Sequence, residues 1–361
     1  MIQDDKCGII YGDLCPMALD QHGRFDGKKF TLDEDGLRVE LQAAANAGAN
    51  AVRFLPDFTG VWGKHPGGKK SQFQPCVLNA KETAWILGTY SKDKGWIPAW
   101  NTYFFPIQDR IFQIANEAGL TVIYCLFEGC QFNSGARIWS PWYSNEQGIT
   151  TFYDPKADIF SKPWVGTMTV RAARRDVILG FGNELENKAA PDFVERVIFP
   201  YLKIRKWSLS RVTLGATAKI VGAGDSIQDL IRKKVRDTFG LVMEKDVIQE
   251  DHGWPFTATL PLWGPKPYRK LYSDDGFYGG HSLCDKSFKG VRPSATEWGK
   301  LSLDILKKYP AAASGRERLI SFEHLPAGYS TGNLECKIAP IKAISTAYHN
   351  KWGVWPKNYK S

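Results

Sequence analysis

The chain has 361 residues, of which 43% are hydrophobic and 13% aromatic, and its formal net charge is +9. This composition indicates a globular protein with a sizeable core. No uncharged apolar run of about 18 residues occurs, and the start lacks the basic flank and apolar stretch of a signal peptide. These features exclude a membrane-spanning helix, and we expect no membrane partner and a cytoplasmic location unless the protein is exported by another route.

Neither the positive charge nor the cysteines indicate a nucleic-acid or metal site. The densest basic segments, Lys203 to Arg211 and Arg232 to Arg236, have helical periodicity, which is typical of solvated helix faces. A preference for anionic surfaces or acidic polymers stays open. The seven cysteines are scattered without CxxC pairs, and His281 with Cys284 would be only half a metal site. We therefore expect reduced thiols, no metal, no cofactor and no nucleic-acid partner.

Helices and strands alternate along the chain, and no linker separates them. The first predicted strand is Cys7 to Gly12. Periodicity and turn residues then predict helix and strand pairs at 32–47 and 50–56, 107–118 and 120–128, 167–175 and 177–182, 192–207 and 212–221, 226–238 and 246–253, and 295–308 and 318–324. A last helix is predicted at 334–350, and an eighth strand would be Gly353 to Trp355.

This alternation predicts the class of fold. Several strands are continuously apolar, which indicates a parallel sheet covered on both faces. Seven or eight such units favour an α/β fold of the (β/α)8 TIM-barrel type over an open doubly wound sheet, which stays the alternative. We expect one barrel domain over residues 1–361, with long loops after the strands and a last helix that is short or missing. No G-x-G-x-x-G follows the first strand, which counts against a dinucleotide-binding fold.

Two of the predicted strands end at carboxylates. The segment "DVILGFGNELEN" (176–187) runs from an apolar strand into Asn183 and Glu184, and "LISFEH" (319–324) reaches Glu323. A carboxylate at the end of an apolar strand must be paired, solvated or used, and catalytic residues of barrels lie at C-terminal strand ends. Two carboxylates at one barrel mouth are the minimum for glycoside hydrolysis, in which one protonates the leaving oxygen and the other attacks the anomeric carbon or activates water.

At these residues the chain resembles clan A of the glycoside hydrolases, the retaining (β/α)8 enzymes that include the family five cellulases and mannanases. The resemblance implies that Glu184, after Asn183, is the acid/base at the end of strand four. It implies that Glu323 is the nucleophile at the end of strand seven and that Arg53 of "NAVRF" contacts it. His252 of "EDHGW" matches a strand-six site histidine. The order of the strands extends the likeness over nearly the whole chain.

Two positions depart from the family pattern. Family five usually has a histidine at the end of strand three, where this chain has Glu128, and a tyrosine two places after the strand-six histidine, where it has Trp254. These departures concern the close family more than the clan. Glu128 and Asp251 are further strand-end carboxylates that could bind sugar hydroxyls or replace one of the catalytic pair, and Glu186 is the alternative acid.

Each assignment also has a purely structural alternative. Glu184 could be salt-bridged to a basic residue, and Glu323 could cap the segment that follows it. Arg53 could only neutralise a buried charge, although a cation beside a nucleophilic carboxylate would keep that carboxylate ionised. His252, on an apolar strand, could be a core histidine.

The thirteen tryptophans are the next signal, because indole faces stack on sugar rings as well as on core side chains. Those that follow predicted strands, on the presumed active face, are Trp62, Trp85, Trp96, Trp100, Trp139, Trp142, Trp254, Trp263 and Trp355. The segment 57–105 is a long insertion after strand two, which we interpret as one wall of a substrate groove. Alternatively, its tryptophans fill a small core of their own.

Together these patterns predict a monomeric retaining glycosidase that cleaves a β-linked polysaccharide or oligosaccharide, similar to β-glucan or mannan, in polysaccharide degradation. The predicted catalytic residues are Glu184 and Glu323, with carboxyl groups about 5 to 5.5 Å apart. The predicted substrate-binding residues are Arg53, Asn183, His252, Trp254, Trp355, Glu128 and Trp62. Endo action is favoured over exo action. The alternatives are a depolymerase of an acidic or bacterial surface glycan and a catalytically silent carbohydrate-binding barrel.

Overall fold

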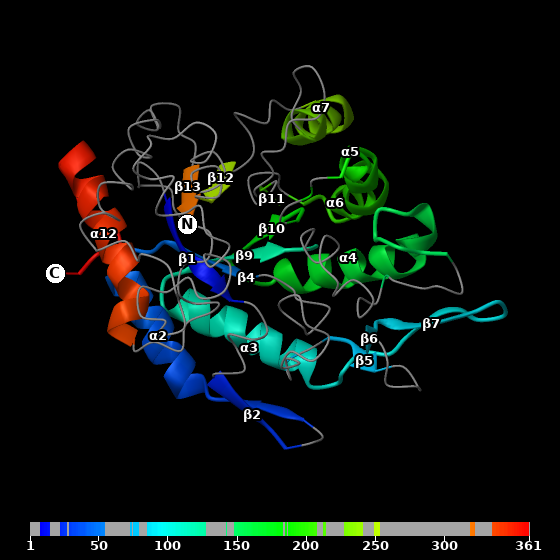
Figure 1. Ribbon diagram of the computed structural model, residues 1–361, viewed down its shortest axis with the longest axis horizontal. Coiled ribbons are helices and arrows are strands. Elements are labelled where there is room, and N and C mark those ends of the chain that lie inside the picture. The colour runs from blue at the N-terminus through cyan, green and yellow to red at the C-terminus, as the bar shows by residue number, and fades with distance from the viewer. Residues whose placement is uncertain are drawn as a thin grey trace, which may run out of the picture.

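Seven parallel strands form the centre of the protein in the computed structural model (Figure 1). The structure describes residues 8–14, 22–26, 29–54, 73, 75–78, 85–127, 142, 148–182, 185, 187–207, 212–213, 227–240, 249–252, 318–321 and 334–360. The strands of the central sheet are β1 (Gly8–Leu14), β4 (Ala51–Phe54), β9 (Thr121–Cys125), β10 (Val177–Gly180), β11 (Val212–Thr213), β12 (Gln249–His252) and β13 (Arg318–Ser321). Each of these seven strands falls at a position where the sequence predicts one.

The order of the sheet is β11-β10-β9-β4-β1-β13-β12, and every neighbouring pair is parallel. The two strands at its ends, β11 and β12, follow one another in the chain. This is the cyclic order that a closed barrel of seven strands would have. In the described part of the chain the order runs from one end strand to the other, and no ladder joins the two.

The predicted eighth strand is wrong. Residues 353–355 form a bend and a loop, and Gly353 has a φ of +72°, which is outside the extended region. Strand β13 pairs directly with β1, with Gly8 opposite Leu319 and Ile9 opposite Ile320. The apolar residues of this segment reflect a stack of aromatic rings in the C-terminal tail, which is considered below.

Helices pack around the sheet in the order of the strands they accompany. They are α2 (Glu34–Asn46), α3 (Phe104–Glu117), α4 (Asp158–Ala172), α5 (Ala190–Phe193), the π-helical turn η5 (Val194–Ile198), α6 (Phe199–Ile204), α7 (Ile227–Phe239) and α12 (Leu334–Trp352), with the short 3-10 turn η4 (Pro155–Ala157) before α4. In Figure 1, α12, α2 and α3 lie side by side along one side of the sheet, and α12 also contacts β1. The predicted helix at 295–308 lies outside the described residues.

Helix boundaries follow local chemistry. The Asp33 side chain caps α2 by accepting a hydrogen bond from the Gly36 amide at 3.0 Å, and Glu34 and Asp35 lie in its first turn. Helix α4 begins at residue 158, well before the predicted 167. Its buried face includes Ser161 and Thr169, so apolar periodicity alone does not mark its first half.

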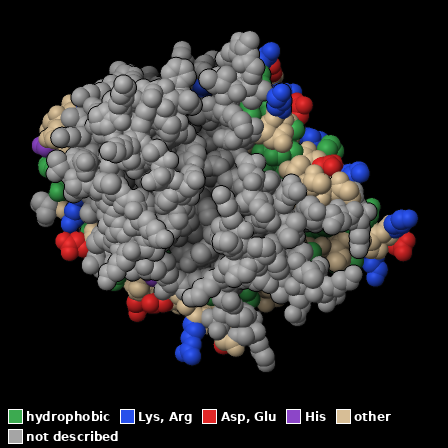
Figure 2. Space-filling model, in the orientation of Figure 1, with side chains coloured by type: hydrophobic (Ala, Val, Ile, Leu, Met, Phe, Trp, Pro, Cys, Tyr) green, Lys and Arg blue, Asp and Glu red, His purple; other side chains and the backbone are tan. Residues whose placement is uncertain are grey.

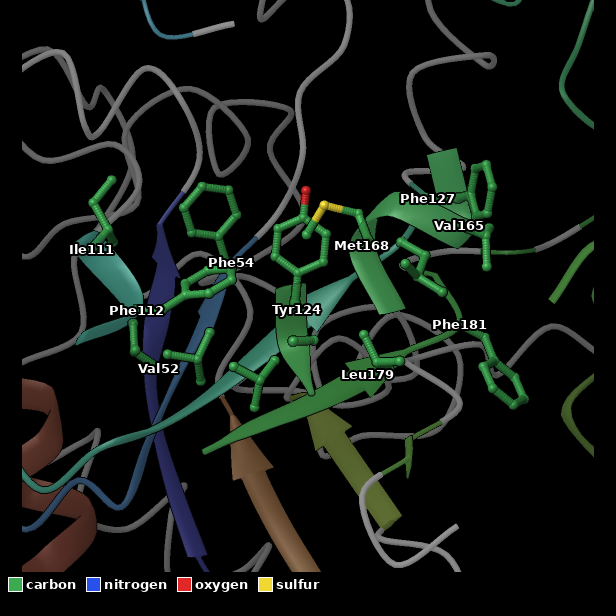
Figure 3. Close-up of a cluster of buried hydrophobic side chains, with 14 of the residues drawn as sticks. Val52, Phe54, Ile111, Phe112, Tyr124, Phe127, Val165, Met168, Leu179 and Phe181 are labelled. Atoms are coloured by element: carbon green, nitrogen blue, oxygen red, sulfur yellow. The ribbon is translucent and has the colours of Figure 1, made fainter. Parts of the chain in front are cut away.

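Alternate strand residues face two different cores. Val52, Phe54, Tyr124 and Leu179 point toward the helices, where Phe54 stacks on Tyr124 with ring centroids 5.2 Å apart (Figure 3). A separate cluster on the opposite face of the sheet consists of Ile10, Ala51, Ile123 and Ile178. We call this opposite face the inner face. A strand residue belongs to one face or the other according to its place in this alternation.

Two hairpins that the sequence did not reveal occupy the described part of the insertion after β4. They are β5 (Val77–Leu78) with β6 (Trp85–Ile86), and β7 (Gly88–Ser91) with β8 (Gly95–Pro98). A third, near the N-terminus, joins β2 (Gly23–Phe25) to β3 (Phe30–Leu32). Gly95 supplies the positive φ of +70° that the β7–β8 turn requires.

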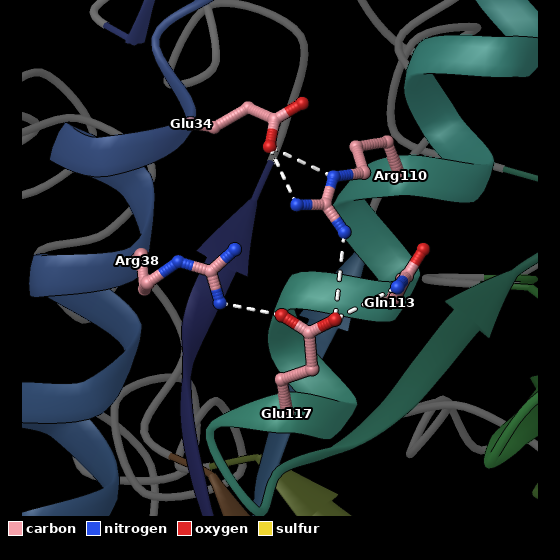
Figure 4. Close-up of polar contacts among 5 residues, drawn as sticks. All are labelled: Glu34, Arg38, Arg110, Gln113 and Glu117. Carbon is pink, nitrogen blue, oxygen red and sulfur yellow. Dashed lines mark hydrogen bonds and ion pairs between the residues drawn. The ribbon is translucent and has the colours of Figure 1, made fainter.

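The surface carries charges of both signs. Between α2 and α3, Arg110 contacts Glu34 at 2.6 Å and Glu117 at 3.4 Å, while Arg38 donates to the other Glu117 oxygen (Figure 4). In the view of Figure 2, acidic and basic side chains stand next to one another around the rim of the described surface. On these faces of α2 and α3 the basic side chains are paired with acidic ones.

Candidate functional site

The C-terminal ends of parallel strands meet at one edge of a sheet, and the predicted catalytic carboxylates follow those ends. Glu128 comes three residues after β9, Glu184 four residues after β10, and Glu323 two residues after β13. Strand β9 is separated from β13 by β4 and β1, and β10 lies next to β9. These three glutamates, and also Asn183, Glu186, Trp62 and Trp254, lie outside the described residues, so their roles stay predictions.

Arg53 is the predicted site residue that the structure describes in most detail. It is the third residue of β4 and has no solvent-exposed surface. Its register partners are Asp13 on β1 and Ile123 on β9. Because Val52 and Phe54 belong to the helix-facing core, Arg53 alternates with them onto the inner face. A guanidinium so deeply buried must have anionic or polar partners.

Two other predicted residues, Asp251 and His252, are neighbours on β12 and occupy alternate faces of the sheet. His252 is its last residue and pairs with Ser321 of β13, whereas Asp251 pairs with Ile320. Ile320 in turn pairs with Ile9, which belongs to the helix-facing core. Paired positions of neighbouring strands share a face, so position 252 lies on the inner face with Arg53 and position 251 lies on the other. The roles of His252 and Asp251 stay predictions.

Trp355 lies at the other end of the strands. It stacks on His349 and Tyr359, each with a ring-centroid separation of 4.2 Å and an interplanar angle below 10°. In the same tail, the Asn358 amide donates to the carbonyls of Ala49 and Gly119 at 2.8 and 3.1 Å, just before β4 and β9 begin. The indole is thus stacked on two parallel rings, although it stays 40% exposed. The structure thus places Trp355 away from the predicted site, against the expectation that it binds sugar there.

Trp96 and Trp100 of the insertion pack against the rest of the protein. Trp100 contacts Trp96 at 5.5 Å, Phe105 at 5.3 Å and Trp164 at 5.8 Å between ring centroids. Trp96 also lies edge-on to Phe160 at 6.4 Å. These two rings therefore pack against the main hydrophobic core through α3 and α4, and not only against one another. Trp62, which was predicted to bind substrate, lies outside the described residues.

An aromatic cluster follows β9 and was not recognised from the sequence. Phe127 contacts Phe193 at 4.9 Å, Phe152 at 5.0 Å and Trp142 at 5.6 Å between ring centroids. The Trp142 indole donates to Ser161 Oγ at 2.6 Å and is 1% exposed. Trp142 is therefore a core residue rather than part of an open aromatic face. Phe127 directly precedes Glu128, so this cluster anchors the end of β9.

Among the residues that the structure describes, no three histidine, cysteine, aspartate or glutamate side chains are grouped so that they could hold a metal ion. Within the same residues, none of the helices has the length and apolar character needed to cross a bilayer. Cys76 and Cys125 are buried thiols.

Comparisons with known proteins identify the fold. No protein-family model and no curated protein matches the chain. A subfamily 18 enzyme of glycoside hydrolase family 5 from Streptomyces cattleya, solved with GlcNAc, is 14% identical over 96% of this chain and 80% of that chain, with a TM-score of 0.54. A glutamate-to-alanine variant from the same organism, solved with Manβ1-4GlcNAc, is 11% identical over 96% and 82%, with a TM-score of 0.51. A family 5 enzyme from Prevotella bryantii B14 is 11% identical over 96% and 97%, with a TM-score of 0.47. The chain shares the fold of the two Streptomyces structures.

Proposed function

We propose that the protein is a retaining glycoside hydrolase that acts on a β-linked glycan, with Glu323 as nucleophile and Glu184 as acid/base. One observation carries the proposal: the inner face of a parallel sheet holds a fully buried Arg53, and glutamates follow the ends of β10 and β13 at the same edge. A buried cation at a strand edge rimmed by carboxylates is the electrostatic arrangement that keeps a nucleophilic carboxylate ionised.

The fold supports this proposal. We propose that the sheet closes into a barrel, because its end strands β11 and β12 are consecutive in the chain and the Streptomyces structures align over 96% of it. Closure would bring the end of β10 across the barrel mouth from the end of β13. In such barrels the loops at the C-terminal strand ends carry the active site.

The chemistry requires the two glutamates to differ in protonation. The ionised Glu323 carboxylate attacks the anomeric carbon and forms a glycosyl ester, while the bond to the leaving oxygen breaks and Glu184 gives its proton to that oxygen. Glu184 then takes a proton from water, the water oxygen attacks the anomeric carbon, and the ester bond to Glu323 breaks. The charge of Glu323 raises the pKa of Glu184 in the first step, and its loss in the ester lowers that pKa for the second.

The substrate follows less directly from the fold. The Streptomyces structures hold GlcNAc and Manβ1-4GlcNAc. We propose a β-linked glycan with gluco- or manno-configured units as the substrate, and cleavage within a chain in preference to its ends.

The test is a release assay on β-glucans, mannans, xylans and Manβ1-4GlcNAc, followed by two variants. Glu323→Gly should abolish turnover, and azide should restore it with an inverted glycosyl azide as product, because the small anion occupies the space of the nucleophile. Glu184→Ala should still form the covalent ester from substrates with a good leaving group, and azide should then give a retained product. Glu335→Ala, an exposed carboxylate in the first turn of α12, is the matched control and should behave as wild type.

The outcomes separate the alternatives. Binding of the panel sugars without release by the wild-type protein would indicate a catalytically silent carbohydrate-binding barrel. Wild-type rates in both Glu184→Ala and Glu323→Gly would show that the pair is wrongly chosen, with Glu128 and Glu186 next in line. Activity confined to acidic glycans would instead support the depolymerase alternative.

A further inference from the structure

The loops that precede the strands of the central sheet lie together at one end of the protein. Main-chain bonds join three of these loops in a row. The Thr121 amide donates to the Asn50 carbonyl at 2.9 Å, and the Val122 amide donates to the Asp176 carbonyl at 3.1 Å. The Asn358 side chain of the C-terminal tail bonds the carbonyls that precede β4 and β9. We call this end, which is opposite the proposed active site, the strand-start face.

Exposed basic side chains gather on the strand-start face. They come from segments that are far apart in the sequence, namely the end of α4, the end of α6 and the tail after α12. Their exposed members are Arg174, Lys203, Arg205, Lys206, Lys357 and Lys360. The helix dipole favours a cation in the last helical turn, which accounts for Lys203. The other five lie at or beyond the ends of their helices, so the dipole does not account for them.

Acidic side chains at this end do not balance the cations. Residues 336–361 contain five lysines and no aspartate or glutamate. Three described carboxylates lie at the strand-start face, and each is bonded or paired within the protein: Glu117 with Arg38 and Arg110, Asp176 with Thr121, and Asp237 with Arg236. In the described part of the chain this face is therefore positively charged, which favours an anionic partner.

Apolar side chains are exposed on the same face. Ile204 is 72% exposed, Val354 50% and Trp355 40%. Six large apolar side chains are exposed in the described part of the chain, and these three are half of them. Each has basic neighbours in the sequence, since Ile204 lies between a lysine and an arginine and Trp355 lies two residues before a lysine. Exposed apolar side chains of this size gain free energy when an apolar medium covers them.

The combination of cations with aliphatic side chains favours a lipid bilayer over other anionic partners. Nucleic acids and acidic polysaccharides attract lysine and arginine, but they offer no apolar medium for Ile204 and Val354. A sugar ring would need an open indole face, whereas Trp355 is already stacked on two rings. An anionic bilayer supplies both requirements, because its headgroups attract cations and its interface accepts aliphatic and indole side chains.

We infer that the strand-start face binds the surface of an anionic lipid bilayer. Ile204, Val354 and Trp355 enter the headgroup region, and the lysines and arginines around them contact the lipid phosphates and carboxylates. This inference departs from the expectation of no membrane partner, and it does not depend on the proposed function. Because the proposed active site lies at the opposite end of the strands, a bound bilayer would leave that site open to a glycan.

The test is sedimentation of the whole protein with sucrose-loaded vesicles in about 0.1 M salt. Vesicles of phosphatidylcholine with about one-third phosphatidylserine are compared with vesicles of phosphatidylcholine alone. The wild-type protein should bind the anionic vesicles at least about tenfold more tightly than the neutral ones, and this preference should shrink as the salt concentration rises.

The first variant removes cations from the strand-start face. Arg174→Gln, Arg205→Gln and Lys360→Gln in one chain should weaken binding to anionic vesicles about 100-fold, because each cation near such a surface contributes about fivefold. The matched control removes three exposed cations from segments that follow strands, through Arg24→Gln, Lys92→Gln and Lys94→Gln. It makes the same change in net charge, and its affinity should stay within about threefold of wild type.

The second variant removes apolar surface without changing the charge. Ile204→Ser with Val354→Ser should weaken binding to anionic vesicles about tenfold, because the two side chains no longer gain from entering the interface. Val39→Ser is the matched control, since Val39 is 59% exposed in the middle of α2, and it should bind as wild type. Circular dichroism and thermal midpoints show whether each variant is folded.

The outcomes decide between the partners. A wild-type protein that binds neither kind of vesicle would overturn the inference, as would equal affinities of the cation variant and its control. If the Ile204→Ser, Val354→Ser variant binds vesicles as wild type, and the cation variant loses as much affinity for heparin as for vesicles, the partner is an acidic polymer and the bilayer is wrong. Vesicle binding by a protein that cleaves no glycan would uphold this inference while the proposed function fails.

Discussion

Tyr11 and Tyr124 are both buried on the helix-facing side of the sheet. They differ in hydrogen bonding, because only the Tyr11 hydroxyl has a partner in the described part of the chain, and this makes them a matched pair. The Tyr11 hydroxyl donates to Glu40 Oε1 at 2.9 Å, and the other oxygen of that carboxylate lies 3.0 Å from His22 Nε2. The Tyr124 hydroxyl is equally buried, and it has no hydrogen-bond partner in the described part of the chain. Replacing each by phenylalanine removes one oxygen and leaves the packing of the ring unchanged. We predict that Tyr11→Phe destabilises the protein and that Tyr124→Phe does not.

The magnitudes follow from what each hydroxyl does. Tyr11 donates to a carboxylate that is only 4% exposed, and a hydrogen bond to a charged group contributes about 1.5–3 kcal/mol to the free energy of unfolding. Tyr11→Phe should lower that free energy by this amount. A buried hydroxyl without a partner is itself destabilising by about 1–3 kcal/mol, so Tyr124→Phe should not lower the free energy of unfolding and should raise it by up to about 3 kcal/mol.

The two tyrosines should also make the free energy of unfolding depend on pH. Burial raises the pKa of Tyr11 well above its usual value, and the charge and hydrogen bond of Glu40 raise it further. Burial likewise raises the pKa of Tyr124 well above its usual value. The unfolded chain then releases these protons first, near pH 10, while the folded protein keeps them. Each tyrosine therefore contributes stability that is complete below about pH 10 and falls as the pH rises above it.

The assay is urea unfolding followed by tryptophan fluorescence and far-UV circular dichroism, at neutral pH and at intervals up to about pH 11. Equal m-values would confirm that the variants unfold from the same compact state. Above about pH 10 the gap between wild type and Tyr11→Phe should narrow, because the variant lacks the group whose contribution is being lost. A Tyr11→Phe variant as stable as wild type, or a Tyr124→Phe variant that loses more than Tyr11→Phe, would refute the reasoning.

Four further variants test other parts of the structure. Trp355→Ala should lower the free energy of unfolding by about 1–3 kcal/mol through the loss of two stacked rings, and it should leave the rate on any substrate unchanged because it lies at the opposite end of the strands. Gly48→Ala should reduce the yield of folded protein, because φ is +110° and a Cβ atom would lie 2.1 Å from Ser345 Oγ; Gly95→Ala, also at positive φ but with open space, should lower the stability by only about 1 kcal/mol in the same thermal scan. Glu117→Gln should lower the thermal midpoint slightly in low salt and not at all in about 1 M NaCl, since its arginine contacts are exposed and screened.

The sequence predicts the sheet well because each strand carries its signal locally. A helix that ends at Gly48 or Gly119, followed by an apolar run, indicates a strand, and β4 and β9 lie where this pattern predicts them. Both glycines have positive φ values of +110° and +84°, so the residue type and the local backbone requirement agree. The carboxylates that follow strand ends are likewise visible from the sequence, since the parallel order alone brings those ends to one edge.

Features that depend on pairing could not be predicted from the sequence. The register shift at Gly12 exists only relative to β4, so no property of β1 alone shows that Asp13, and not Gly12, is opposite Arg53. Trp355 was mistaken for a strand residue because aromatic rings that stack on one another have the same composition as rings that line a sheet. Trp100 was placed in a groove wall for a similar reason, although its ring fills a core.

The two ends of the strands differ in what they contribute to the free energy of folding. Hydrogen bonds hold the starts of the strands, whereas a buried charge lies near their C-terminal ends. At the start of the strands the loops bend through positive φ, and their carbonyls are bonded by the last helix and the tail: Ser345 Oγ donates to Ala47 at 2.7 Å, and the Lys360 amide donates to Asn46 at 2.8 Å. Every such bond satisfies a loop carbonyl and adds rigidity. At the other end the same sheet buries Arg53, a charge that folding alone does not favour. Proteins place such costly groups at functional sites and offset their cost elsewhere, which is consistent with the site proposed above and with the hydrogen bonds at the opposite end of the strands.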